Sequence, residues 1–203
     1  FHARKLGKGG GAMTFAERFL AADRSLFLVL NGDGGPVMDN LMWALSSKLA
    51  LVPIGIVALW LMWRKYDDKR MFFTAILFIA LVVLFSDRVS TTFKHVLPKF
   101  RPTHEPLLEG LVHNVRGYVG GLYGTVSSHA ANSFGVSLFT ALIIKRRWYT
   151  ATVMTLSAAI CYSRIYLGVH YPADIFFGTV TGLFFGWLCY ITMNYITAKI
   201  FRK

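Results

Sequence analysis

Long apolar runs alternate with short polar segments along most of the chain. Five of these runs approach the roughly 20 residues that an α-helix needs to cross the hydrocarbon core of a bilayer. The first run contains Pro53, which a membrane helix tolerates where neighbouring helices satisfy the freed carbonyl, and the third run is short. The pattern predicts an all-α integral-membrane helical bundle with five transmembrane helices. The expected spans are Leu41–Trp63, Met71–Phe93, Ala130–Ile144, Trp148–Leu167 and Ile175–Ala198.

An amphipathic segment, residues 14–32, precedes the first run. Its apolar side chains fall roughly on one helical face, but four charged residues make it costly to bury in lipid. We expect an N-terminal interfacial amphipathic helix that ends at the turn-rich NGDGGP, and a sixth span is the alternative. The apolar face holds Phe15, Phe19, Leu26, Phe27 and Leu30, and the charges are Glu17, Arg18, Asp23 and Arg24.

Basic clusters in the connections indicate the topology. With five alternating spans, the clusters in residues 64–70, 145–147 and 199–203 all fall on one side. The positive-inside rule makes that side cytoplasmic. The long segment 94–128 and the turn 170–174 then face outward together. A soluble all-α bundle is the alternative to this arrangement.

Composition narrows the class of protein further. Hydrophobic residues make up 55% of the 203 residues and charged residues 16%, against roughly 45–50% and 25% in ordinary soluble domains. This balance excludes a disordered chain, a disulfide-rich scaffold and most nucleic-acid-binding folds. The net charge of +12 therefore favours an anionic membrane as partner and no nucleic acid. Cys161 and Cys189 lie in apolar runs, where cysteine packs as a small hydrophobe.

The two ends of the chain differ in kind. Residues 1–12, FHARKLGKGGGA, are glycine-rich and basic, and we interpret them as an added remnant outside a single domain that covers residues 13–203.

Near the other end, Gly178, Gly182 and Gly186 place a small residue at every fourth position of the last span. Small residues allow close helix packing in lipid. Packing inside the chain's own bundle is favoured over a dimer seam, and the oligomeric state stays open.

Polar residues gather at the outward ends of these helices. Cations such as Lys94, Arg101 and Arg164 neutralise phosphate oxygens, and backbone N–H groups at Ser127–Ser128 would add donors at a helix N-terminus. A histidine held by a carboxylate can act as a nucleophile, and a second histidine can protonate a leaving oxygen. No carboxylate cluster for Mg²⁺ accompanies them, so we expect phosphoryl transfer without metal or cofactor. His170 with Asp174 fits the nucleophile, and His129 fits the acid.

Three ordered motifs resemble the signature of the type 2 phosphatidic acid phosphatase (PAP2) superfamily. The family pattern is K-x6-R-P, then P-S-G-H, then S-R-x5-H-x3-D. The first and third match in full, as Lys94-x6-Arg101-Pro102 and Ser163-Arg164-x5-His170-x3-Asp174. The second keeps Ser127 and His129 but has Val126 and Ser128 in place of Pro and Gly.

The resemblance implies a role for each matched residue. His170 would attack phosphorus, oriented by Asp174, to form a phosphohistidine, and His129 would act as general acid and then as base. The substrate phosphate would be held by Lys94, Arg101, Ser127, Ser128 and Arg164. The substitution at Ser128 bears on the tightness of this cradle, because glycine lets backbone approach a ligand closely. Asp87, Pro102 and Ser163 are candidate supporting positions, and Asp87 either orients Lys94 or Arg88 or is a satisfied buried polar group.

These features predict a metal-independent lipid phosphatase in the bacterial inner membrane, with its site facing the periplasm or the outside. The candidate substrates are a polyprenyl diphosphate, a glycerophospholipid phosphate such as phosphatidylglycerophosphate, and a lipid A phosphate. A vanadium-dependent haloperoxidase is one alternative, but those enzymes are soluble. A membrane protein that only binds phospholipid headgroups is the other, and the complete motif set argues against it.

Overall fold

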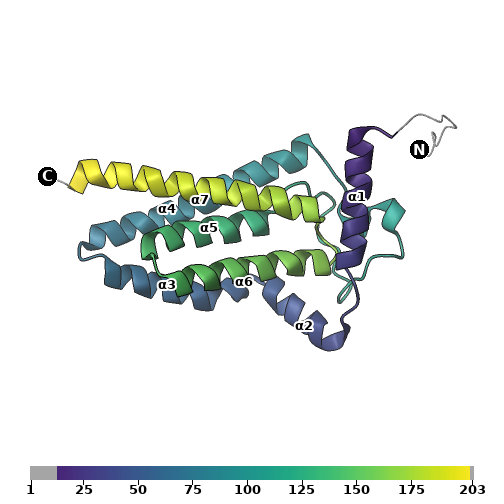
Figure 1. The fold of residues 1–203 in the computed structure, drawn as a ribbon, viewed down its shortest axis with the longest axis horizontal. Helices are drawn as coiled ribbons and strands as arrows, with labels where there is room; N and C mark the ends of the chain where they lie inside the picture. The colour runs from purple at the N-terminus through teal and green to yellow at the C-terminus, as the bar shows by residue number, and fades with distance from the viewer. Residues whose placement is uncertain (1–12, 202–203) are drawn as a thin grey trace.

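The computed structural model describes residues 13–201, and helices dominate this part of the chain (Figure 1). The segment interpreted as an added remnant, residues 1–12, lies outside the described residues. Between residues 13 and 201, the only β-pairing is an isolated bridge between Phe100 and Tyr123. The α-helices are α1 (Phe15–Leu30), α2 (Gly35–Ser46), α3 (Val52–Lys65), α4 (Lys69–Val96), α5 (Ser128–Ile144), α6 (Arg147–Tyr166) and α7 (Pro172–Phe201), and the 3-10 turns are η1 (Lys48–Leu51), η2 (Pro102–His104) and η3 (Pro106–Leu108).

Two helices are long and apolar enough to cross a membrane by length and composition. They are α4, over Lys69–Val96, and α7, over Pro172–Ile200. The pair α2 and α3 makes a third candidate if the two count as one broken span. Helix α5 is apolar but shorter, so the described residues support two or three spans by this measure.

The first expected span is not one continuous helix. The chain bends by 79° between α2 and α3, and the turn η1 fills the break. Pro53 occupies the first turn of α3, the position where its missing N–H costs no intrahelical hydrogen bond. The proline therefore marks the start of a helix rather than a tolerated interior position.

Helix α5 is the centre of the bundle and packs against α4, α6 and α7. Its contact with α7 is made by the glycine stripe. A Cβ placed on Gly182 would lie 2.1 Å from the carbonyl oxygen of Ala131, and one on Gly186 would lie 2.4 Å from that of Gly135. The prediction that this stripe packs inside the chain's own bundle is confirmed, because each glycine meets backbone of α5.

Helix α1 lies across one end of the bundle rather than along it (Figure 1). A capping box of Thr14 and Glu17 starts the helix. Phe27 packs edge-on against Tyr171 and is buried with it, whereas Phe15 and Phe19 are exposed. One part of the apolar face expected for this segment therefore packs on the bundle, and the other part is exposed.

The two ends of the bundle differ in charge. The α3–α4 and α5–α6 connections lie at one end with the C-terminus, and they carry the basic clusters (Figure 1). A cavity lined by residues of α3 and of the α5–α6 turn, including Arg64, Lys65, Lys145 and Arg146, shows that two of these clusters are neighbours. The motif residues lie at the opposite end, beneath α1. Both cysteines are buried and free, as expected.

Candidate active site

The three motifs meet at the end of the bundle that α1 covers. Helices α4 and α6 end there and α5 and α7 begin there, while the RP segment and the turn after α6 supply loop residues. The matched side chains therefore come from four helix ends and two loops.

The last motif forms a histidine–carboxylate pair. His170 Nδ1 lies 3.3 Å from Asp174 Oδ2, and the same oxygen accepts the backbone N–H of Tyr171 at 3.0 Å. Both side chains are almost fully buried. Burial, together with the charges of Arg101 and Arg164 and of two lysines, holds the pKa of His170 well below its ordinary value of 6.5. The imidazole is therefore neutral near pH 7, with Nε2 left free.

The second motif opens α5. Ser127 is the N-cap residue and its hydroxyl accepts the N–H of Ala130, while its own N–H donates to the carbonyl of Asp174 at 3.1 Å. The ammonium of Lys94 donates to the Ser128 hydroxyl at 3.0 Å. The first and second motifs are thus bonded to each other through the residue that departs from the family pattern.

Arg164 is buried in the last turn of α6. One Nη donates to the hydroxyl of Ser46 at the end of α2, and the other lies 3.4 Å from the hydroxyl of Tyr118. Its Nε is buried and makes no hydrogen bond among the described residues. A phosphate oxygen is one group that would satisfy such a donor.

Arg101 extends along the loop that precedes α5. Its Nε donates to the carbonyl of Tyr123 at 3.1 Å. A Cβ on Gly124 would lie 2.9 Å from Arg101 Cγ and 3.2 Å from His170 Cε1. Gly124 leaves the space that lets this arginine and the histidine approach each other.

The other expected residues lie around this core. The partly buried His129 experiences the charges of Arg164, His170, Lys94 and Arg101. Asp87 accepts a hydrogen bond from Asn132 at 2.9 Å, and its charge acts on Lys94. Ser163 is buried and donates to the carbonyl of Ile160, and Pro102 opens the turn η2.

Four contributors to this region carry no motif signal in the sequence. Ser46 and Tyr118 hold Arg164, Lys99 bonds Asp174, and Asp23 bonds Lys99. Lys99 lies inside the variable stretch of K-x6-R-P, and Asp23 lies in a helix expected at the membrane surface. The buried placement of Asp23 could have been suspected from its cost in lipid, but its partner depends on the fold.

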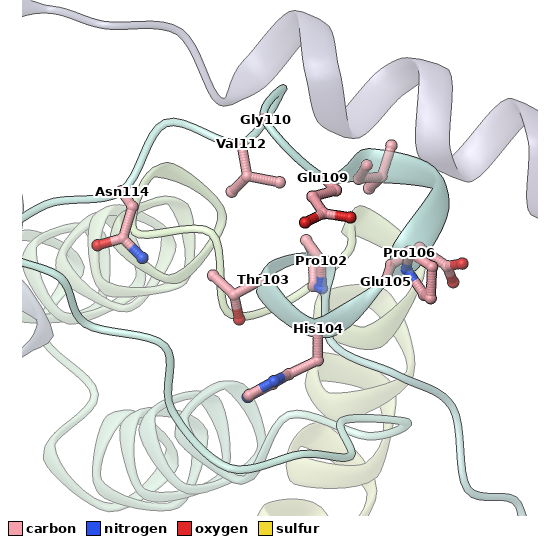
Figure 2. A pocket seen from close by; sticks show the side chains of 10 residues that line it. Pro102, Thr103, His104, Glu105, Pro106, Glu109, Gly110, Val112 and Asn114 are labelled. Atoms are coloured by element: carbon pink, nitrogen blue, oxygen red, sulfur yellow. The ribbon is translucent and has the colours of Figure 1, made fainter.

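The residues that follow Arg101 in the chain line a polar pocket of about 360 Å³ (Figure 2). Its walls come from residues 102–114 and include Thr103, Glu105, Glu109 and Asn114. The backbone N–H of Thr103 donates to the carbonyl of Gly168, two residues before His170. A wall residue of the pocket is therefore hydrogen-bonded to the turn that carries the candidate nucleophile.

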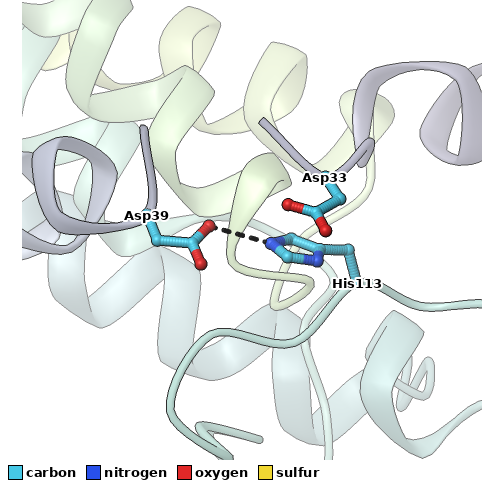
Figure 3. Close-up of side chains that lie close together, drawn as sticks. All are labelled: Asp33, Asp39 and His113. Atoms are coloured by element: carbon cyan, nitrogen blue, oxygen red, sulfur yellow. Dashed lines mark hydrogen bonds and ion pairs between the residues drawn. The ribbon is translucent and has the colours of Figure 1, made fainter. Parts of the chain in front are cut away.

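A second cluster, of Asp33, Asp39 and His113, holds α2 against the long loop between α4 and α5 (Figure 3). His113 Nε2 lies 3.0 Å from Asp39 Oδ1, and Tyr166 donates its hydroxyl to the same oxygen at 2.6 Å. The ligand atoms of the three residues lie within 4.8 Å of one another. Because Asp39 already accepts hydrogen bonds from two partners, we interpret the cluster as a hydrogen-bonded clamp and not as a metal site.

Comparison with known proteins agrees with the geometry. The PAP2 superfamily profile matches residues 71–198. The chain is 36% identical to the lipid A 4′-phosphatase of Porphyromonas gingivalis (90% of this chain, 78% of that protein) and 33% identical to that of Bacteroides thetaiotaomicron (88% and 80%). Its fold resembles the crystal structure of a PAP2-type phosphatidylglycerolphosphate phosphatase from Bacillus subtilis, with a TM-score of 0.65, 19% identity, and coverage of 92% of this chain and 89% of that one. The chain therefore belongs to the PAP2 superfamily and is a membrane lipid phosphatase.

Proposed function

We propose that this protein removes a phosphate from lipid A through a phosphohistidine on His170. The observation that carries the proposal is the buried His170–Asp174 pair, which engages Nδ1 and leaves Nε2 for attack, while the charges of two arginines and two lysines act on the imidazole. The similarity to two lipid A 4′-phosphatases supports the choice of lipid.

In the first step, His170 Nε2 attacks phosphorus and an N–P bond forms. Asp174 accepts the Nδ1–H and so keeps the lone pair on Nε2. The P–O bond to the lipid breaks, its electron pair goes to the leaving oxygen, and His129 supplies the proton. The negative charge on the phosphoryl oxygens is stabilised by Lys94, Arg101 and Arg164 together with the N-terminal N–H groups of α5.

In the second step, water attacks the phosphohistidine. His129, now neutral, accepts a proton from the water, and the N–P bond breaks with its electron pair returning to His170. Inorganic phosphate leaves, and both histidines regain their starting protonation. Positive charge in this site comes from side chains, so no step calls for a metal ion.

The proposal places the site at the outer face of the bacterial inner membrane. The basic clusters at the opposite end support a cytoplasmic location for that end under the positive-inside rule. In this orientation, five spans cross the membrane and α1 lies in the outer interface. One domain then extends over residues 13–203.

The polar pocket after Arg101 supports a substrate with a large polar headgroup. Its carboxylates, hydroxyl and amide are groups that bind sugar hydroxyls and amines. A sugar bearing the phosphate would extend into this pocket, whereas a polyprenyl diphosphate offers no group for it. We propose the pocket as the part of the site that favours lipid A.

The test is phosphate release by the purified protein in detergent with EDTA. Lipid A, undecaprenyl diphosphate and phosphatidylglycerophosphate are compared, with His170→Ala as the blank. Release from lipid A that His170→Ala abolishes supports the proposal, and acid-labile ³²P on the wild-type chain identifies the intermediate. Release from undecaprenyl diphosphate alone would move the substrate to that class, and release unaffected by His170→Ala would overturn the mechanism.

A further inference from the structure

A chain of charged contacts runs from α1 to the candidate nucleophile. Lys99 Nζ lies 2.9 Å from Asp23 Oδ2 on one side and 3.2 Å from Asp174 Oδ1 on the other. Asp174 then accepts from His170 Nδ1 through its second oxygen. Two ion pairs therefore connect helix α1 to the carboxylate that orients His170.

Both carboxylates in this series of contacts are buried. The side chain of Asp23 is 4% exposed, that of Asp174 is 2% exposed, and Lys99 is 23% exposed. Buried carboxylates are costly unless they are paired and hydrogen-bonded. Lys99 is the cation that bonds both of them, so its loss would leave two buried carboxylates without this shared counterion.

Asp23 also fixes the start of α7. Its Oδ1 accepts the backbone N–H of Ala173 at 2.9 Å, one residue before Asp174. Lys99 lies 4.0 Å from the ring centroid of Tyr171, which packs on Phe27 of α1. Asp23 thus holds the backbone of the Asp174 turn and, through Lys99, also its side chain.

We infer that Asp23 and Lys99 are positioning residues for the reaction, holding the Asp174 carboxylate in the orientation that keeps His170 ready for attack. The inference rests on the proposed function for its kinetic consequence. Neither residue is among those to which the proposed function assigns the substrate phosphate. Their effect should therefore fall on kcat, with little change in KM.

The variants that separate this role from simple packing are Lys99→Met, Lys99→Arg and Asp23→Asn. Lys99→Met keeps the length of the side chain and removes its charge. We expect kcat to fall about 10–100-fold, as it does when a group that orients a functional side chain is lost. KM should stay within about threefold of the wild type. Lys99→Arg restores a cation and should recover most of the loss. Asp23→Asn should lower kcat about threefold to tenfold, because the N–H of Ala173 keeps an acceptor.

Arg24→Met is the matched control. Arg24 is the next residue of α1 and bonds Glu105 of the α4–α5 loop at 3.3 Å rather than Asp174, and its charge acts on Tyr171. If α1 only has to pack on the end of the bundle, Arg24→Met and Asp23→Asn should lower kcat by the same factor. If Asp23 positions the site, Arg24→Met should keep kcat within about twofold of the wild type.

A second readout does not depend on turnover. The Nδ1–H of His170 in the detergent-solubilised, ¹⁵N-histidine-labelled protein reports its hydrogen bond to Asp174, and His170→Asn identifies the signal. The inference expects this signal to shift in Lys99→Met and to return in Lys99→Arg. An unmoved signal in Lys99→Met, or equal losses in Asp23→Asn and Arg24→Met, would overturn the positioning role. Absence of phosphate release by the wild type would overturn the proposed function alone, since the ¹⁵N signal still decides the positioning role.

Discussion

Gly182 of α7 faces the carbonyl oxygen of Ala131 in α5 so closely that a Cβ would lie 2.1 Å from it. One turn earlier, Gly178 faces the carbonyl of Ser127, the N-cap residue of α5. The beginnings of the two helices carry His129 and Asp174. The closeness of α5 and α7 therefore determines how the candidate acid approaches the His170–Asp174 pair.

Gly182→Ala should destabilise the protein and reduce its activity. Because the clashing atom is backbone, the helices must separate, and overpacking of this kind costs about 1–3 kcal/mol. The checks are thermal unfolding in detergent and phosphate release per folded molecule. Gly55→Ala is the control, since Gly55 lies in α3 with open space where its Cβ would be. Equal stability of the two variants would show that α5 and α7 are not held by this contact.

The sequence predicted the helical class and the inner packing of the glycine stripe because both depend on local periodicity. It also predicted which residues gather, since the motif side chains lie at the ends of apolar runs. Helix ends of alternating spans meet at the same face, so the convergence of Lys94, Ser127 and Arg164 follows from their place along the chain.

What the sequence could not predict depends on contacts between distant segments. Asp23 and Lys99 are 76 residues apart, and Arg164 and Ser46 are 118 apart. The charges in α1 predict a helix at the membrane surface, whereas Asp23 is buried and accepts the backbone N–H of Ala173. Hydropathy also does not reveal the break between α2 and α3, because a proline in the first turn of a helix and a proline inside one look alike in it.

Ser128→Gly should weaken substrate binding modestly. The variant restores the family's residue but removes the hydroxyl to which Lys94 donates at 3.0 Å. A hydrogen bond to a charged group contributes about 1.5–3 kcal/mol at most, and water offsets part of its loss at a partly exposed lysine, so we expect KM to rise about twofold to tenfold. The measurement is KM and kcat for the lipid A reaction. A lower KM would mean that the hydroxyl restrains Lys94 away from the phosphate.

Glu109→Gln should distinguish the candidate lipids. Glu109 lines the polar pocket after Arg101 (Figure 2), where we place the sugar of lipid A. Loss of its charge should raise KM for lipid A about threefold to tenfold, because the amide of Gln still accepts a hydrogen bond and only about 1 kcal/mol of binding free energy is lost. KM for undecaprenyl diphosphate should stay unchanged. An equal change for both lipids would remove the pocket from substrate selection.

Activity should survive removal of divalent metal ions. Lys94, Arg101 and Arg164 supply the positive charge that a metal would otherwise bring to the phosphoryl oxygens. Phosphate release is measured after dialysis against EDTA, and again after Mg²⁺ is added back. Loss of release with EDTA and recovery with Mg²⁺ would contradict the side-chain mechanism.

His170 should remain neutral at a pH where an exposed histidine is half protonated. Its burial and the nearby charges of Arg101, Arg164, Lys94 and Lys99 lower its pKa below 6.5. In the unfolded chain the same group titrates near 6.5, so below this pH the unfolded state binds a proton that the folded state refuses. The contribution of His170 to the free energy of unfolding should then fall as the pH drops below 6.5, by up to about 1.4 kcal/mol per pH unit.

A ¹⁵N titration of the histidine-labelled protein measures this directly, with His170→Asn identifying the resonance. The expected result is an unprotonated Nε2 at pH 6, and a shallower loss of stability in acid for His170→Asn than for the wild type. Half-protonation of His170 at or above pH 6.5 would contradict it. A nucleophile that stays neutral across this range is what the mechanism needs, because only the unprotonated Nε2 can form the N–P bond.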